Sequence, residues 1–158
     1  FMENGTITAA TSSPVSIGAS AILITSRTYA EKNSIQIKAT IKGRSIVGVD
    51  WRRMGMGPLP ATENVLKNLD MTINDIDVIE LNEAFSAQAL YVIKEGGWDA
   101  SKINLNGGAI ALGHPLGCSG ARIITTLLSV MEQKNSRTGL ATMCIGTGQG
   151  IATILERD

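Results

Sequence analysis

The sequence contains little of what several classes of protein require. Its 158 residues include one histidine and two cysteines, and only 4% of them are aromatic. The 14 basic side chains are balanced by 14 acidic ones, so no basic face for nucleic acid or anionic lipid is indicated. No apolar run approaches the roughly 20 residues of a membrane-spanning helix. The composition therefore favours an ordinary globular domain with neither nucleic acid nor a membrane as its partner.

The two cysteines, Cys118 and Cys144, could form one disulfide, but a chain of this length with an ordinary core does not need one. We therefore expect free thiols in a reducing compartment, with the cytoplasm as the location. The opening residues Phe1-Met2-Glu3-Asn4 resemble neither a signal peptide nor a usual initiator sequence. We expect the chain to be a segment of a longer protein.

Apolar segments alternate with segments of helical periodicity along most of the chain. Strands are predicted at 21–25, 35–41 continuing through 45–49, 77–81, 102–105, 140–145 and 151–155. Loops are predicted at 5–20 and 54–60, and helices at 27–33, around 65–69, at 84–95 and at 121–131. Because most strands are apolar throughout, we predict an α/β layered domain with a buried sheet. A boundary is predicted near Ser34, where a polar helix ends and a new strand begins.

The only histidine, His114, lies in a glycine-rich stretch and is followed directly by Pro115. Glycine permits close backbone approach, and proline restricts the residue before it, so the stretch is expected to hold one imidazole in a fixed pose. The spacing of Gly108 and Gly113 matches a phosphate-binding loop, but His114 and Pro115 replace the lysine and hydroxyl residue that such a loop needs. A solvent-exposed or satisfied core histidine is the alternative; the setting favours a chemical role. No metal site is indicated, because the cysteines lack ligand spacing and no second histidine exists.

Cys144 ends an apolar strand and precedes the turn that begins with Gly146. A thiol in this place can simply fill space. The backbone N–H groups just beyond it could instead stabilise a thiolate or the oxyanion of a thioester. The glycine spacing of this turn does not indicate a dinucleotide site, because the turn joins two strands. Cys118, at the start of a helix, is interpreted as a small packing residue.

Asn82 lies where a predicted strand meets a predicted helix. Asparagine is a good helix N-cap, which is the structural interpretation. Its amide could equally orient a water or a carbonyl oxygen, with Glu83 holding the segment in place. The sequence leaves both interpretations of Asn82 open.

Taken together, these motifs resemble the C-terminal half of a thiolase. The resemblance rests on their order and spacing and covers essentially the whole chain; Pro14 and Ile17 depart from the family's pattern. The matching segments are Gly5–Ala9, Met54–Ala61, Asn82–Phe85, Gly107–Arg122 and Cys144–Gly150. The resemblance implies a thiolase-like layered fold, with residues 1–35 as the end of the N-terminal domain and residues 36–158 as a C-terminal α/β domain with a mixed sheet. It also implies that the acylated cysteine lies upstream of Phe1, in a missing N-terminal domain.

The resemblance further implies a role for each site residue. His114 would accept the proton of the nucleophilic cysteine and help to bind a thioester oxygen. Cys144 would act as acid or base at the substrate α-carbon, and Asn82 would hold a water in the hole formed with His114. The N–H of Gly146 would contribute to a second oxyanion hole. Ser13 would contact the pantetheine arm of CoA.

The implied reaction is the thiolysis of a 3-oxoacyl-CoA or its reverse, a Claisen condensation. Acyl-CoA and CoA would be substrates, no metal or other cofactor would be needed, and the protein would be a homo-oligomer. One alternative is a noncatalytic CoA-binding or assembly module that retains the motifs. Another is a ketoacyl synthase, which is disfavoured because a cysteine in a Cys-x-Gly turn is typical of thiolases. The fragment by itself is expected to be inactive.

Overall fold

A mixed sheet forms the centre of the computed structural model, which describes residues 2–157. Within that range the sheet has four strands in the order β1-β4-β3-β2. They are β1 (Thr40–Gly48), β4 (Gln149–Glu156), β3 (Thr138–Ile145) and β2 (Val78–Leu81). The pairs β1–β4 and β4–β3 are antiparallel, whereas β3 and β2 are parallel. The predicted α/β class with a buried mixed sheet is confirmed.

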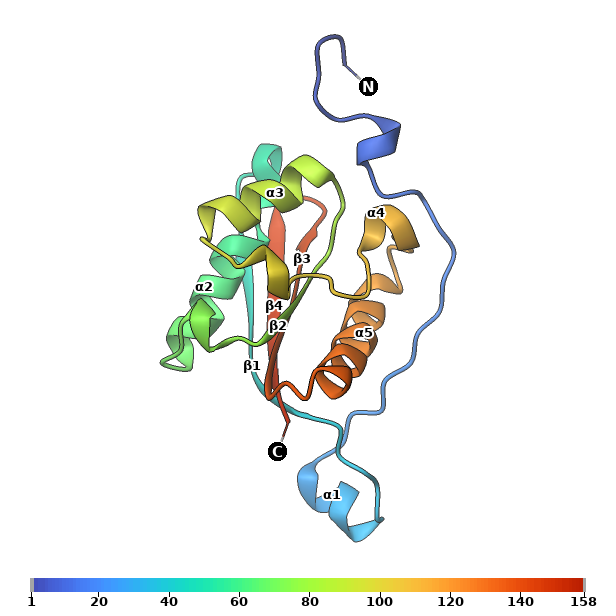
Figure 1. Cartoon of the computed structure of the whole chain (residues 1–158), viewed down its shortest axis with the longest axis vertical. Coiled ribbons are helices and arrows are strands. Elements are labelled where there is room, and N and C mark those ends of the chain that lie inside the picture. The colour runs from blue at the N-terminus through green and yellow to red at the C-terminus, as the bar shows by residue number, and fades with distance from the viewer. Residues whose placement is uncertain (1, 158) are drawn as a thin grey trace.

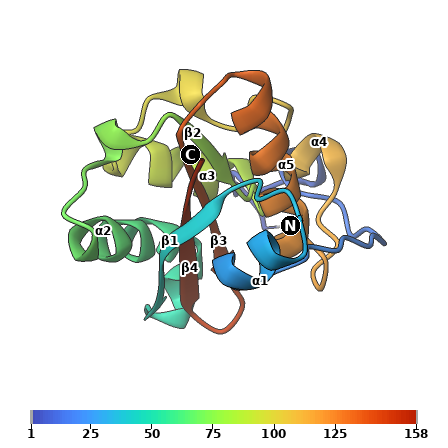
Figure 2. The same ribbon diagram turned by 90° about the horizontal axis from the view of Figure 1, so that it is seen from below.

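Helices cover both faces of this sheet, as Figure 1 and Figure 2 show: α2 lies on one side and α5 on the other. The longer helices are α2 (Pro58–Asn68), α3 (Ser86–Glu95) and α5 (Ser119–Gln133), and the shorter ones are α1 (Arg27–Lys32) and α4 (Ala109–Leu112). Short 3-10 turns occupy Ala9–Thr11, Trp51–Met56, Ile73–Asp75 and Ala100–Lys102. In the sequence, α3 and α5 lie between β2 and β3. Two parallel strands need a long crossover connection, and this segment provides it.

The alternation of side chains along β2 builds two separate cores. Ile79 and Leu81 belong to a buried cluster with residues of α2 and α3, whereas Val78 belongs to a cluster with residues of α5. Successive strand residues point to opposite faces, so Glu80 shares the α5 face with Val78. All four residues of β2 are buried, which explains why the strand is apolar apart from this one carboxylate.

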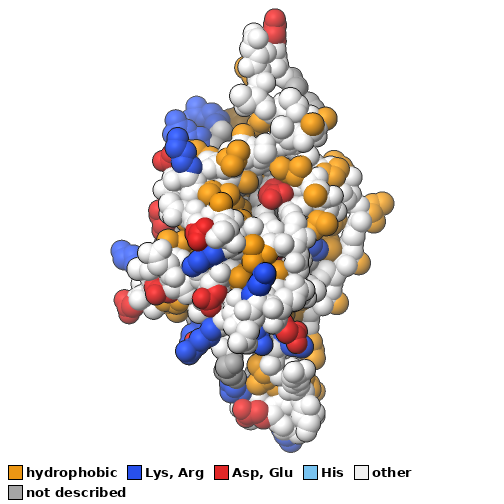
Figure 3. All heavy atoms as spheres, viewed as in Figure 1, with side chains coloured by type: hydrophobic (Ala, Val, Ile, Leu, Met, Phe, Trp, Pro, Cys, Tyr) orange, Lys and Arg blue, Asp and Glu red, His pale blue; other side chains and the backbone are white. Residues whose placement is uncertain are grey.

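The segment of residues 12–26, which we call the arm, precedes α1. It runs outside the layered body, past α4 and α5 (Figure 1). The strand predicted at 21–25 is wrong, because this part of the arm is not hydrogen-bonded into a sheet. Leu23 and Ile24 are 73% and 71% exposed. Figure 3 shows hydrophobic side chains, in orange, along the right of the molecule, the side on which the arm lies in Figure 1. The arm lines one wall of an apolar groove of about 560 Å³, whose opposite wall includes Ile124 and Leu128 of α5.

Other predicted boundaries also need correction. Residues 35–39 belong to no strand, and β1 begins only where Thr40 pairs with Glu156. The strand predicted at 102–105 is a 3-10 turn followed by a single bridge between Ile79 and Ile103. The loop predicted at 54–60 is largely helical, since Pro58 opens α2 at a position where its missing N–H costs nothing. Within residues 2–157, no helix has the length and apolar character to cross a membrane.

Candidate active site

The β2–α3 connection and the glycine-rich loop before α5 meet beyond the end of β2. Asn82, the first residue after β2, is fully buried, and its backbone N–H donates to the carbonyl of Thr142 on β3 at 3.0 Å. It is not an N-cap, because α3 begins at Ser86 with Phe85 in the capping position. The structural interpretation of Asn82 is therefore wrong, and its amide is free to serve another purpose.

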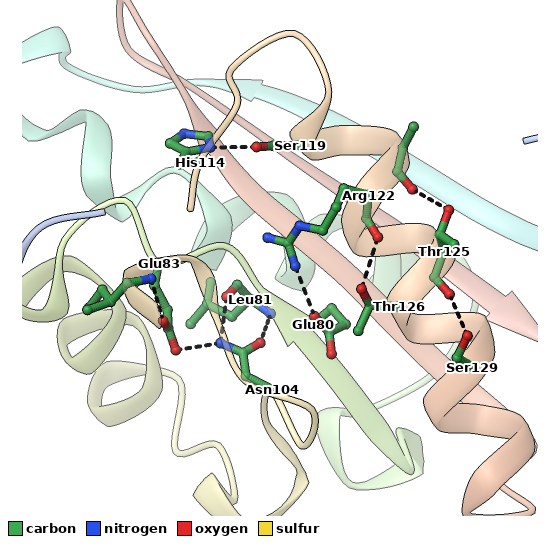
Figure 4. Close-up of polar contacts among 12 residues, drawn as sticks. Glu80, Leu81, Glu83, Asn104, His114, Ser119, Arg122, Thr125, Thr126 and Ser129 are labelled. Atoms are coloured by element: carbon green, nitrogen blue, oxygen red, sulfur yellow. Dashed lines mark hydrogen bonds and ion pairs between the residues drawn. The ribbon is translucent and has the colours of Figure 1, made fainter. Parts of the chain in front are cut away.

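His114 lies opposite Asn82 and is held at both ring nitrogens. Its Nε2 is 3.4 Å from Nδ2 of Asn82. Its Nδ1 is 2.6 Å from the hydroxyl of Ser119, a contact that Figure 4 shows. The backbone N–H of His114 donates to the carbonyl of Pro14 at 3.2 Å, so the arm fixes the main chain of the histidine. Burial, and secondarily the charge of Arg122, lower the pKa of His114. The lowered pKa favours the neutral ring, which is the form able to accept a proton.

Glu83 braces the glycine-rich loop against the β2–α3 connection. One carboxylate oxygen accepts from Nδ2 of Asn104 at 2.8 Å, and the other accepts from the backbone N–H of Ile110 at 3.1 Å. A Cβ added to Gly108 would lie 2.0 Å from the Glu83 carboxyl carbon, so only glycine admits this close approach. The expectation that Glu83 holds this segment in place agrees with these contacts.

Asn104 is a positioning residue that the sequence reasoning missed. It adopts a left-handed φ of 49°, a conformation that asparagine tolerates better than most residues. Its side chain accepts from the N–H of Leu81 at 2.9 Å and donates to the carbonyl of Leu81 at 2.8 Å, as Figure 4 shows. The amide thereby takes the place of a neighbouring strand at the end of β2, next to Asn82. Its position three residues before the glycine pair Gly107-Gly108 was the available signal.

Ser13 links the arm to the β2–α3 connection. Its backbone N–H and its hydroxyl both donate to the carbonyl of Ala84, each at 3.0 Å. Gly113 has a φ of 102°, and a Cβ there would lie 2.4 Å from the hydroxyl oxygen of Ser16. The arm therefore contacts both loops, and Ser13, Asn82 and His114 are gathered at one end of the sheet.

Cys144 and Gly146 lie at the turn from β3 to β4. Cys144 is 5% exposed and pairs with Gly150, and burial raises the pKa of its thiol. Because β2 and β3 are parallel, Asn82, just after β2, and Cys144, near the end of β3, lie at the same end of the sheet. No hydrogen bond joins Cys144 to Asn82 or His114 within the described chain. Cys118 is also a free, buried cysteine, in agreement with the packing interpretation.

Gly146 is exposed at that turn, and a Cβ added there would meet nothing within 4 Å. Its φ is not positive, unlike those of Thr147 (70°) and Gly148 (91°). Neither packing nor backbone conformation within residues 2–157 requires glycine at this position. The open space in front of Gly146 leaves its backbone approachable from outside.

A buried pair of charged residues, also missed by the sequence reasoning, lies behind the histidine. Glu80 on β2 and Arg122 on α5 are 3.9 Å apart, with side-chain exposures of 2% and 19% (Figure 4). Burial raises the pKa of Glu80 to about 7, against the opposing charge of Arg122 and with a further contribution from Glu83. One Glu80 oxygen and two Arg122 nitrogens, Nε and Nη1, have no hydrogen-bond partner in the described chain.

The arrangement can hold and move protons with an imidazole, a neutral thiol and backbone donors. No group of three or more His, Cys, Asp or Glu side chains suited to a metal ion occurs among residues 2–157. These groups come from two loops and a strand turn, and imidazole and thiol groups are side chains that can act in acid–base chemistry.

Comparison with known proteins identifies a family for the chain. The family model for the thiolase C-terminal domain matches residues 35–157. A 3-ketoacyl-CoA thiolase of Vibrio vulnificus is 60% identical over 98% of this chain and 41% of its own length. A 3-ketoacyl-CoA thiolase of Shewanella oneidensis is 58% identical over the same shares of the two chains. The chain thus spans about two fifths of the length of the relatives it matches.

Solved structures are also similar. The Bacillus anthracis acetyl-CoA acetyltransferase superposes with a TM-score of 0.97 and 39% identity, over 99% of this chain and 40% of that one. Human mitochondrial 3-ketoacyl-CoA thiolase in complex with CoA superposes with a TM-score of 0.91 and 37% identity, over 100% of this chain and 40% of that one. The chain belongs to the thiolase family.

Proposed function

We propose that the chain supplies the acid–base half of an acyl-transfer site that moves an acyl group between an enzyme cysteine and CoA. The reaction would be the thiolysis of a 3-oxoacyl-CoA or the reverse Claisen condensation. The nucleophilic cysteine would come from a preceding N-terminal domain, to which residues 1–35 would belong. The observation that carries the proposal is the position of His114, held between Asn82 and Ser119 at the end of the sheet where Cys144 lies.

His114 would take the proton of the nucleophilic thiol at Nε2. The neutral ring that burial favours is the form that can do this. The resulting thiolate would attack the 3-keto carbon, whose oxygen becomes the acyl-enzyme oxygen. The protonated imidazole and a water held by the Asn82 amide would bind the thioester oxygen of the acetyl-CoA unit, where negative charge develops as the carbon–carbon bond breaks. A buried Asn82 whose Oδ1 has no partner within residues 2–157 supports a role in holding such a water.

Cys144 would supply the second proton transfer. When the bond between the α-carbon and the 3-keto carbon breaks, the α-carbon would take the proton of the Cys144 thiol and leave as acetyl-CoA. The Cys144 thiolate would then accept the proton of an incoming CoA thiol, whose sulfur attacks the acyl-enzyme and releases the shortened acyl-CoA. A raised thiol pKa supports this order, because it keeps Cys144 protonated until the bond breaks.

Gly146 and Ser13 would bind the thioester around these groups. The approachable backbone at Gly146 suits an N–H that donates to the acyl-enzyme oxygen. Ser13, next to the Asn82 segment, would contact the pantetheine arm through backbone or hydroxyl groups beside Ala84. CoA would be a substrate, with no metal or other cofactor, and the whole protein would be a cytoplasmic homo-oligomer.

A noncatalytic CoA-binding module remains the alternative function. Such a module would need the loops that contact CoA. It would not need the imidazole of His114 beside the buried amide of Asn82. The two proposals differ in what they require of His114.

A chimeric enzyme tests the proposal. This chain would replace the matching segment of the Vibrio vulnificus thiolase, and cleavage of acetoacetyl-CoA by CoA would be followed. We expect the chimera to be active, and the 158-residue chain alone to be inactive because the cysteine is supplied from elsewhere. A folded chimera that binds CoA without cleaving the substrate would support the noncatalytic module. Cleavage by the chain alone would contradict the assignment of the nucleophile.

A further inference from the structure

Ser119 is the first residue of α5 and is fully buried. Its hydroxyl oxygen lies 2.6 Å from Nδ1 of His114 and 3.1 Å from the carbonyl oxygen of Pro115. Its backbone N–H also donates to the Pro115 carbonyl, at 2.9 Å. The serine side chain therefore has one orientation, fixed by the first turn of the helix and directed at the histidine ring.

The hydroxyl has one proton for its two neighbours. The Pro115 carbonyl carries no hydrogen, so a hydrogen bond between the two oxygens uses the hydroxyl proton. The contact with Nδ1 then requires that the ring nitrogen carry a hydrogen and donate it to the serine oxygen. This assigns the ring proton of neutral His114 to Nδ1.

The surroundings of the other ring nitrogen lead to the same tautomer. The atom that faces Nε2 is Nδ2 of Asn82, which can only donate. A donor opposite Nε2 requires a lone pair there and excludes a second N–H. Two independent neighbours, Ser119 and Asn82, thus agree.

We propose that Ser119 is a positioning residue that holds His114 as the Nδ1–H tautomer and leaves the Nε2 lone pair available as a base. The hydrogen bond at one imidazole nitrogen sets which nitrogen is protonated. When Nε2 takes a proton, Nδ1–H keeps its acceptor, and Ser119 needs no rearrangement. The tautomer is inferred from the contacts of Ser119 and Asn82, and its use in catalysis rests on the proposed function.

The single histidine makes the test direct. The chain, prepared without a histidine tag and labelled with ¹⁵N-histidine, gives one imidazole in long-range ¹H–¹⁵N correlation spectra recorded above the pKa of the ring. We expect Nδ1 to have the shift of a protonated nitrogen and Nε2 that of an unprotonated one. A spectrum dominated by Nε2–H would overturn the proposal, without any variant being needed.

Variants isolate the hydroxyl. Ser119→Ala is expected to make Nε2–H the major tautomer, and Ser119→Thr, which keeps the hydroxyl, is expected to restore Nδ1–H. Ser129→Ala is the matched control, because Ser129 donates to the carbonyl of Thr125 at 3.2 Å on the exposed side of the same helix. Ser129→Ala should leave the spectrum unchanged. Retention of Nδ1–H in Ser119→Ala would refute the role of the hydroxyl.

The chimera adds a kinetic readout. There, Ser119→Ala is expected to lower kcat about 10- to 100-fold with little change in KM, the usual cost of losing a partner that orients a functional histidine. An unchanged kcat combined with the expected tautomer shift would refute the catalytic use of the tautomer. An inactive chimera would refute the proposed function while leaving the spectroscopic result intact.

Discussion

Replacing Glu80 by glutamine should stabilise the folded chain above neutral pH and leave its stability unchanged near pH 4.5. The carboxyl group is buried against α5, with Arg122 3.9 Å away. Burial outweighs the attraction of Arg122 and raises the pKa of Glu80 from 4.5 to about 7. The folded chain therefore favours the protonated acid, which glutamine imitates in shape and charge.

The sign and size follow from proton linkage. Between pH 4.5 and about 7 the folded state binds more protons at Glu80 than the unfolded state does, so this group makes stability fall as pH rises. One pKa unit corresponds to about 1.4 kcal/mol, so the full effect is on the order of 3 kcal/mol and is complete above pH 7. The pKa of His114 is lowered from its ordinary value of 6.5, so this group makes the folded state less stable as the pH falls below 6.5. That contribution is the same in the wild type and in Glu80→Gln.

Urea unfolding of wild type and Glu80→Gln at acidic and alkaline pH measures the effect. We expect the variant to gain stability only at the alkaline end. Glu63→Gln, at an exposed position of α2, is the control and should change stability by less than about 0.5 kcal/mol at either pH. Removing one member of a favourable buried ion pair would instead cost about 3 to 5 kcal/mol. A loss of that size at alkaline pH would refute the reasoning.

Three substitutions test other parts of the structure. Gly150→Ala should lower the free energy of unfolding by about 1 to 3 kcal/mol in urea, because its Cβ would lie 2.0 Å from the carbonyl oxygen of Gly57; an unchanged midpoint would contradict this packing. Gly146→Ala, whose Cβ meets nothing within 4 Å, should leave stability within about 0.5 kcal/mol yet slow thiolysis by the chimera, and an unimpaired rate would contradict the role of its N–H. Leu140→Ala, in the fully buried core beneath α2, should cost about 2 to 5 kcal/mol by thermal or urea unfolding, and a smaller loss would show that this core is loosely packed.

The layered fold could be read largely from local pattern. Apolar runs such as 140–145 and 151–155 are strands because both their faces are buried. The run at 21–25 has the same composition but no hydrogen-bonded neighbour in the described chain, and a strand requires one. Pairing partners are a property of the whole protein, which local composition does not encode.

The candidate site was predictable only in part. His114 stands out because it is unique and is surrounded by glycine. Ser119 and Asn104 were missed because each acts through a contact that exists only after distant segments meet. Glu80 was missed for a different reason: within an apolar strand, sequence alone does not reveal that alternation directs it toward Arg122.

The acid–base role of His114 is tested by the thiolysis assay of the chimera with and without His114→Ala. We expect the chimera to cleave acetoacetyl-CoA in the presence of CoA and His114→Ala to reduce kcat by about 100-fold or more, the usual share of a general base. A folded chimera with the same kcat in both forms would contradict it.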